Sequence, residues 1–276
     1  MLGWLLVAGW AIVTIMAFTV PDFAAFAGTA QLALMLLFVG WHGTARYGAK
    51  GMATFAIAVI VIVNIFETAS IATGFPFGFY EHQAAMGPKL GLVPIIIGPI
   101  YFVNGYVAWT LGNILLGEPD RDRGHGSLVA LAIAAALIVT GWDAVVDPPG
   151  ATALHSWIYR HGGGYYGVPL SNFGGWLLTT SIAFFVAGWL MRRFGTPPRT
   201  RQPLDWWLQP AALFAIQPLP AVLGLLLIPG RSETDAAGNV WNTAHIYEGT
   251  TVVGIVTCLA FGVIAGLAAM RQHGRA

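Results

Sequence analysis

Long apolar segments alternate with short polar segments along the whole chain. Each apolar segment is close to the ~20 residues that a helix needs to cross a ~30 Å hydrocarbon core. The segments are residues 3–20, 24–41, 52–72, 90–116, 127–146, 172–191, 208–229 and 246–270. This pattern predicts an all-α fold, a polytopic membrane helix bundle with about eight transmembrane helices.

The composition indicates that lipid is the solvent for most of the surface. Hydrophobic residues make up 57% of the 276 residues and charged residues only 9%, a balance outside the range of soluble globular chains. No linker or shift in composition divides the chain, so we expect a single integral-membrane domain over residues 1–276. The first apolar segment lacks a basic start and a small-residue cleavage site, which predicts a retained helix.

The net charge and the cysteine content limit which kinds of partner and cofactor the protein can bind. A net charge of +1 argues against a nucleic-acid partner. Cys258 is the single cysteine, which excludes an internal disulfide and a multi-cysteine metal site. The histidine and acidic residues lack the spacing of an H-x-x-x-H pair, so we expect no metal and no other cofactor.

Basic residues in the connecting loops indicate the orientation, because positive side chains favour the cytoplasmic side. The second set of alternating loops carries only Lys89, Arg160 and Arg231. The first set and the C-terminal tail carry ten basic residues: Arg46, Lys50, Arg121, Arg123, Arg192, Arg193, Arg199, Arg201, Arg271 and Arg275. We therefore expect both termini on the cytoplasmic side of a bacterial or archaeal cytoplasmic membrane, and the second set of loops on the outer face.

Three carboxylates stand inside otherwise apolar segments. Glu67 lies in the outer half of the third predicted helix, and Asp143 and Asp147 lie toward the outer end of the fifth. An ionisable group at that depth costs free energy unless it is paired or functional. Asp143 and Asp147 share a helix face if the helix continues, but Pro148 favours a helix end there. A terminating Asp-Pro pair and, for Glu67, an interhelical hydrogen bond are the structural alternatives to function.

Two outer loops mix glycine and proline with aromatic residues. They are TGFPFGFYEH at 73–82 and HGGGYYGVPLSNF at 161–173. Glycine and proline fix tight turns, and aromatic side chains avoid water. We therefore expect both loops to fold back over the helix bundle as lids.

A second polar group is predicted on the outer side, at the start of the last helix. His245 and Glu248 lie there, and Asn242 or Thr243 would supply the N-cap. An ordinary interface role is the alternative to substrate binding for His245 and Glu248.

A series of motifs runs through the middle of the chain. The motifs are Glu67, TGFPFG at 73–78, GPKL at 87–90, VP at 93–94, WD at 142–143, DP at 147–148, GYYGVPL at 164–170, NF at 172–173 and GW at 175–176. In order and spacing they resemble the membrane carotenoid biosynthesis proteins, the family that includes carotenoid 1,2-hydratases of the bisanhydrobacterioruberin hydratase type. The resemblance covers roughly residues 60–180 and implies an enzyme, a hydro-lyase that adds water to the terminal C=C bond of an acyclic carotenoid or related polyprenoid and gives a tertiary alcohol.

Such a reaction needs an acid to protonate the alkene, surroundings that tolerate a tertiary carbocation, and a placed water with a base. We expect Asp143 to be the acid, and Asp147 or Glu67 to orient and deprotonate water. Asn172 would hold the water or a carboxylate, or cap its helix. The cation would lie against the rings of Trp142, Tyr80, Tyr165 and Tyr166. The full set of expected substrate-binding residues is Phe75, Phe77, Tyr80, Glu81, His82, Trp142, Tyr165, Tyr166, Asn172, His245 and Glu248.

Other activities use similar residues. The same carbocation can lose a proton or be captured by an internal double bond, so isomerisation or cyclisation of a terpenoid end group stays open. A transporter would also carry intramembrane carboxylates, but no internal repeat relates the halves of the chain. A retinal photoreceptor is excluded, because Lys50 and Lys89, the only lysines, stand at helix ends. The expected partners are a lipophilic polyene or polyprenoid, water and the bilayer, with the site toward the outer face.

Overall fold

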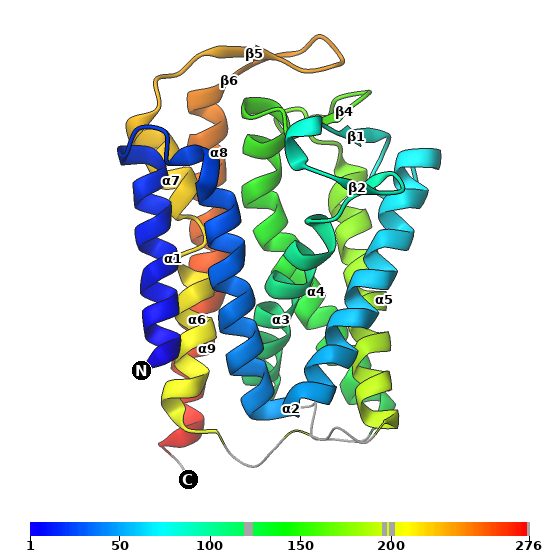
Figure 1. Cartoon of the computed structure of the whole chain (residues 1–276), viewed down its shortest axis with the longest axis vertical. Helices are drawn as coiled ribbons and strands as arrows, with labels where there is room; N and C mark the ends of the chain where they lie inside the picture. The colour runs from blue at the N-terminus through cyan, green and yellow to red at the C-terminus, as the bar shows by residue number, and fades with distance from the viewer. Residues whose placement is uncertain (119–123, 195–197, 199–201, 275–276) are drawn as a thin grey trace.

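The structure is a computed structural model in which long helices pack into one bundle and short strands gather at one end of it (Figure 1). It describes residues 1–118, 124–194, 198 and 202–274. The helices are α1 (Leu2–Thr19), α2 (Ala24–Thr73), α3 (Ile97–Leu116), α4 (His125–Pro148), α5 (Leu170–Arg193), α6 (Leu204–Ala215), α7 (Leu219–Leu227), α8 (Thr243–Gly254) and α9 (Ala260–His273). The strands are β1 (Tyr80–His82), β2 (Lys89–Leu90), β3 (Val93–Pro94), β4 (Trp157–Tyr159), β5 (Ser232–Thr234) and β6 (Val240–Asn242).

The helices have the length and composition of membrane spans, which confirms the predicted all-α membrane bundle. Within the described chain, six helical stretches are long and apolar enough to cross a membrane: Leu2–Thr19, Ala24–Thr73, His125–Ala153, Leu170–Arg193, Leu204–Leu227 and Thr243–His273. α3 is not among the six, and it forms the centre of the bundle, because every residue from Tyr101 to Ile114 is buried. The count of eight transmembrane helices stays a prediction.

The second and third predicted helices are the two arms of α2, which meet at Gly48, inside the predicted break between residues 41 and 52. α2 has 50 residues and reverses direction at Gly48, where φ is 69° and ψ is 169°. This conformation is accessible almost only to glycine, so one residue replaces a connecting loop. Figure 1 shows the first arm of α2 descending and the second arm rising again.

Two other predicted boundaries are corrected by the structure. The fourth predicted helix, 90–116, begins only at Ile97, because β2 and β3 pair with each other just before it. The seventh, 208–229, is divided into α6 and α7. Pro218, whose ring nitrogen has no N–H to continue the helical hydrogen bonds, stands at this break, whereas Pro210 is accommodated inside α6.

The two ends of the bundle differ in character. The start of α1, the bend of α2 and the end of α9 lie toward one end, and the labelled strands lie at the other (Figure 1). The expectation that both termini lie on the cytoplasmic side stays a prediction. Five of the basic residues used for it lie outside the described residues: Arg121, Arg123, Arg199, Arg201 and Arg275.

The two glycine-rich and aromatic-rich segments are joined at the strand end of the bundle. β1 forms the end of the first segment and pairs antiparallel with β4, which precedes the second, and Tyr80 stands opposite Tyr159. Phe77 is buried beneath this pair. At the start of α8, the side chain of Asn242 accepts a hydrogen bond of 2.9 Å from the Ala244 N–H, so Asn242 is the predicted N-cap.

Candidate active site

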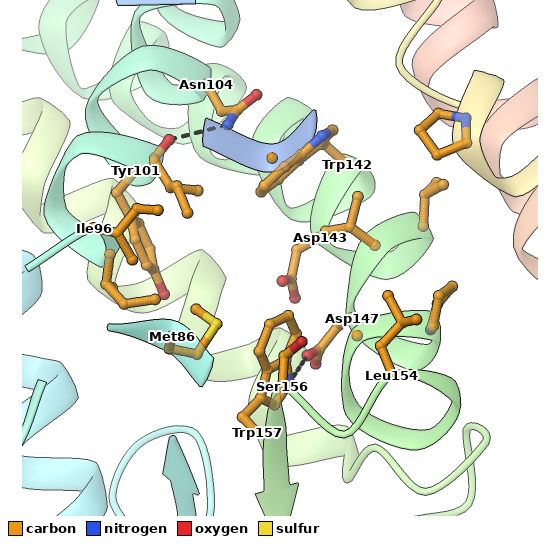
Figure 2. A pocket seen from close by; sticks show the side chains of 18 of the residues that line it. Met86, Ile96, Tyr101, Asn104, Trp142, Asp143, Asp147, Leu154, Ser156 and Trp157 are labelled. Carbon is orange, nitrogen blue, oxygen red and sulfur yellow. Dashed lines mark hydrogen bonds between the residues drawn. The ribbon is translucent and has the colours of Figure 1, made fainter. Parts of the chain in front are cut away.

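A cavity of about 460 Å³ lies next to the β1–β4 sheet. Its walls include residues of α2, α3, α4, α5, α7 and α8, and most of them are aliphatic or aromatic. Figure 2 shows Asp143 and Asp147 projecting from α4 toward this space. The site therefore combines an apolar volume with buried carboxylates, the combination expected for acid chemistry on an apolar substrate.

Asn172 connects the two aspartates. Its Nδ2 donates to Asp143 Oδ2 at 2.8 Å and to Asp147 Oδ2 at 2.7 Å. α5 begins at Leu170 behind the extended Pro169, which places Asn172 in the first turn of α5, facing α4. Of the roles expected for Asn172, holding a carboxylate is the one that the structure supports, because its amide contacts side chains of α4 and does not cap α5.

α4 does not end at Asp147, and the expected helix end there is wrong. The helix runs through Pro148 and continues as a π-helical turn, Pro149–Ala153. Proline has no N–H to donate to the carbonyl four residues earlier, which here belongs to Ala144. The hydroxyl of Tyr165 donates to that carbonyl at 3.0 Å. With the freed carbonyl satisfied, the helix continues, and Asp143 and Asp147 share one face.

The carboxylate of Asp147 is held on both oxygens. Trp157 Nε1 donates to Oδ1 at 2.5 Å, and Tyr159 donates to Oδ2 at 3.0 Å, beside Asn172. Burial, together with the nearby charge of Asp147, raises the pKa of Tyr159 well above its ordinary value, so its hydroxyl keeps its proton and stays a donor. Asp143, by contrast, has its Asn172 contact on Oδ2 only, and no hydrogen bond from the described residues reaches Oδ1.

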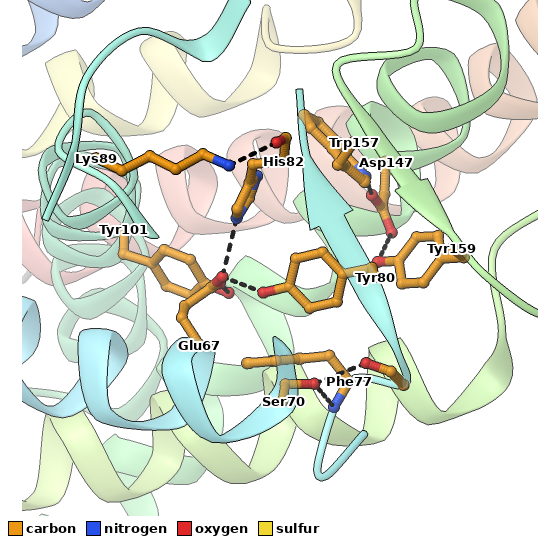
Figure 3. Close-up of polar contacts among 11 residues, drawn as sticks. Glu67, Ser70, Phe77, Tyr80, His82, Lys89, Tyr101, Asp147, Trp157 and Tyr159 are labelled. Carbon is orange, nitrogen blue, oxygen red and sulfur yellow. Dashed lines mark hydrogen bonds and ion pairs between the residues drawn. The ribbon is translucent and has the colours of Figure 1, made fainter. Parts of the chain in front are cut away.

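Glu67 forms a second polar cluster at the cavity wall (Figure 3). Tyr101 donates to its Oε1 at 2.9 Å, the Tyr80 hydroxyl donates to Oε2, and Nε2 of His82 lies 3.3 Å from Oε2. Burial, then the charge of Glu67, raises the pKa of Tyr80, which keeps that hydroxyl a donor as well. Lys89 Nζ donates to the His82 carbonyl at 2.8 Å and holds the strand over the cluster.

Aromatic rings cover the side of the cavity between the two carboxylate clusters. Trp176 stacks on Tyr101 with ring centroids 4.0 Å apart and meets Trp142 at a steep angle, with centroids 5.9 Å apart. The Trp142 Nε1 donates to Gln217 Oε1 at 3.2 Å, which fixes the indole plane. Such ring faces attract positive charge, and they are worth more where water is excluded.

The structure brings most of the expected chemical groups together. The expected residues that line the cavity are Glu67, Phe77, Tyr80, His82, Trp142, Asp143, Asp147 and Asn172. Phe75, Glu81, His245 and Glu248 are exposed and lie outside its lining. Tyr165 and Tyr166 are half-buried beside it, with Tyr165 bonded to α4 and Tyr166 packed against Trp241.

The sequence analysis missed five side chains of the site: Tyr101, Trp157, Tyr159, Trp176 and Gln217. Trp176 belongs to one of the motifs that carry the family resemblance, so the sequence could have identified it as a candidate site residue. Trp157 and Tyr159 follow the π-helical turn in a segment without a motif. Only the tertiary structure shows that both side chains donate to Asp147.

Metal binding finds no support in the described part of the chain, where no three His, Cys, Asp or Glu side chains converge as metal ligands would. The polar groups on the cavity wall include the carboxylates, the imidazole of His82 and the tyrosine hydroxyls.

The fold and the site define a polytopic membrane helix bundle with a buried, carboxylate-lined cavity. The sequence profile of the carotenoid biosynthesis protein family matches residues 23–229, and the chain belongs to this family. A bisanhydrobacterioruberin hydratase of Haloarcula japonica is 34% identical over 136 residues, which are 49% of this chain and 44% of the relative. The aligned part thus spans less than half of that relative's length. No solved structure matches the chain.

Proposed function

We propose that this protein is a hydratase that adds water to the terminal C=C bond of an acyclic carotenoid or related polyprenoid and forms a tertiary alcohol. Membership of the carotenoid biosynthesis family and the similarity to a hydratase support this proposal. The observation that carries it is the pairing of Asp143 with Asp147 at one Asn172 amide, on the wall of an apolar cavity.

Asp143 is the proposed acid. Two carboxylates that share one amide nitrogen in apolar surroundings repel each other when both are ionised, so the pair favours holding a proton. Asp147 is bonded by Trp157, Tyr159 and Asn172, which all donate and favour its charged form. The proton therefore belongs on Asp143, whose Oδ1 has no competing donor among the described residues. From there it can pass to the less substituted carbon of a bound alkene.

The tertiary carbocation that follows lies against rings and negative charge. Trp142, Trp176 and Tyr101 offer their faces, and Asp147 and Glu67 supply the nearby charge. Water then attacks the cation and loses a proton. The apolar walls leave the reacting end of the polyene dry except for the water that is consumed.

The test is expression of the protein in a host that accumulates lycopene or a similar acyclic carotenoid, followed by mass measurement of the pigments. A gain of one water molecule, with its oxygen labelled by labelled water and not by labelled dioxygen, is the expected result. Unchanged mass with altered retention would instead show isomerisation or cyclisation through the same cation. Unaltered pigments, with the protein present in the membrane, would contradict activity on this substrate and leave transport of a small molecule as the alternative.

A further inference from the structure

We propose that His82, supported by Glu67, is the base that binds and deprotonates the attacking water. This inference rests on the proposed hydration. It starts from the hydrogen bonds that the carboxylates already make, because each oxygen of Asp147 and of Glu67 accepts at least one. Neither carboxylate therefore presents an unengaged oxygen to a water molecule.

His82 does present an unengaged acceptor. Its side chain lines the cavity and is 4% exposed, and its Nδ1 is buried without a hydrogen-bond partner. A buried polar atom without a partner costs free energy, so a ligand with an O–H donor is favoured at this position. Water is the donor that hydration requires.

The neighbours of His82 fix which nitrogen is free. Nε2 lies 3.3 Å from Glu67 Oε2, and this oxygen also accepts from Tyr80. Since Glu67 is an acceptor in each of its contacts, Nε2 carries the hydrogen and Nδ1 holds the lone pair. The Tyr80 ring meets the imidazole edge-on, with centroids 5.2 Å apart, and keeps it in this orientation.

The proton balance is simple. Asp143 gives its proton to the alkene carbon, and the π electrons form the new C–H bond. The water oxygen forms the C–O bond with the cation, one O–H bond breaks, and the proton passes to His82 Nδ1 while the electron pair stays on oxygen. The imidazolium then lies against the Glu67 carboxylate, which stabilises it as a carboxylate orients and stabilises the histidine of a catalytic triad. His82 gains the proton that Asp143 loses, so transfer through solvent restores both.

Several charged or polar groups face His82 from the elements packed around it. Tyr80 belongs to its own strand, Lys89 donates to its carbonyl, and Trp157, which does not titrate, stands opposite it on β4. Glu81 and Arg160 form an exposed pair, 3.9 Å apart, on the outer side of the same strands. The groups that share the cavity wall with it are Glu67, Tyr101, Asp143, Asp147 and Tyr159.

The decisive experiment measures kcat and its pH profile for the membrane-embedded protein with the acyclic carotenoid that the wild type hydrates. We expect His82→Gln to lower kcat by about 10²- to 10⁴-fold, the usual contribution of a general base. The acidic limb of the wild-type profile, where His82 becomes protonated and can no longer accept, should vanish from the residual activity. His125→Gln is the same change at an exposed histidine in the first turn of α4. This control should leave kcat and the acidic limb of the pH profile unchanged.

Glu67→Gln separates a positioning role from a structural one. The amide oxygen can still accept from Nε2, but the imidazolium loses its negative neighbour, so the acidic limb should move to lower pH. A purely structural Glu67 would lower the yield of folded protein and leave the position of this limb unchanged.

The outcomes separate this inference from the proposed function. If the wild-type protein does not hydrate the carotenoid, the proposed function is refuted. Hydration by His82→Gln at the wild-type rate with an unchanged profile would refute only the role of His82. If His82→Gln does not fold, the pH profiles of the wild type and of Glu67→Gln provide the test. The role of His82 as the base is refuted if the wild-type profile has no acidic limb, or if this limb does not move in Glu67→Gln.

Discussion

The hydroxyl of Tyr165 donates a 3.0 Å hydrogen bond to the carbonyl of Ala144, the helical acceptor that Pro148 leaves without an N–H. This bond lets α4 pass its proline in helical form, and it keeps Asp143 and Asp147 on one face. Tyr165, which the sequence predicted to bind substrate, thus contacts the backbone of the helix that carries Asp143 and Asp147.

Tyr165→Phe should therefore destabilise the protein and slow hydration. The variant leaves a carbonyl without a partner, at a cost of about 1–3 kcal/mol. Thermal unfolding in detergent, monitored alongside pigment hydration, measures both effects. Tyr166→Phe is the matched control, since no hydrogen bond of its hydroxyl appears among the described residues, and its effect should stay within about 0.5 kcal/mol. Equal stability of the two variants would contradict the role of Tyr165.

Asp143→Asn should lower activity alone, whereas Asp147→Asn should lower both activity and stability. Asparagine at 143 removes the transferable proton and leaves the fold intact, so hydration should fall by about 10²- to 10⁴-fold with a near-normal unfolding temperature. Asparagine at 147 turns an N–H₂ toward Trp157 Nε1 or toward Asn172 Nδ2, and both of these groups can only donate. Asp147→Asn should lose stability as well as activity. Full hydration by Asp143→Asn would move the acid role to another carboxylate.

We expect the aromatic face of Trp142 to stabilise the carbocation and so to raise the rate of hydration. Trp142→Phe and Trp142→Leu both lose the hydrogen bond to Gln217, so the comparison between them isolates the aromatic surface. A cation–π contact of about 0.5–2 kcal/mol corresponds to a rate for Trp142→Leu that is roughly 2- to 30-fold below that of Trp142→Phe. Single-turnover hydration rates would measure the difference. Indistinguishable rates would place the cation elsewhere on the cavity wall.

Gly48→Ala should destabilise the bundle, because a Cβ is strained at the φ of 69° where α2 reverses. The expected cost is on the order of 1–3 kcal/mol. Gly40 lies on the same helix with ordinary helical angles and open space around it, so Gly40→Ala should be neutral or stabilise by up to about 1 kcal/mol. Thermal unfolding of both variants in one detergent provides the comparison, and a neutral Gly48→Ala would mean that the bend tolerates a side chain.

Much of the architecture could be predicted from the sequence, because it depends on local composition. Apolar runs of membrane length predicted the helices, and the motifs around Glu67, Asp143 and Asn172 predicted the family. An error arose where a distant side chain changes what one residue does to the backbone. Pro148 does not end α4, because the hydroxyl of Tyr165 donates to the carbonyl that the proline leaves without an N–H.

The sequence by itself determined that carboxylates stand in apolar helices, since their cost in lipid is a property of residue type and depth. Only the tertiary structure decided which donors meet each one. Trp157 and Tyr159 reach Asp147 through the pairing of β4 with β1, and His82 reaches Glu67 from the other strand of that pair. Hydrogen bonds act over about 3 Å, so the partners of each carboxylate depend on how the chain folds back after each helix, which composition and local pattern do not specify.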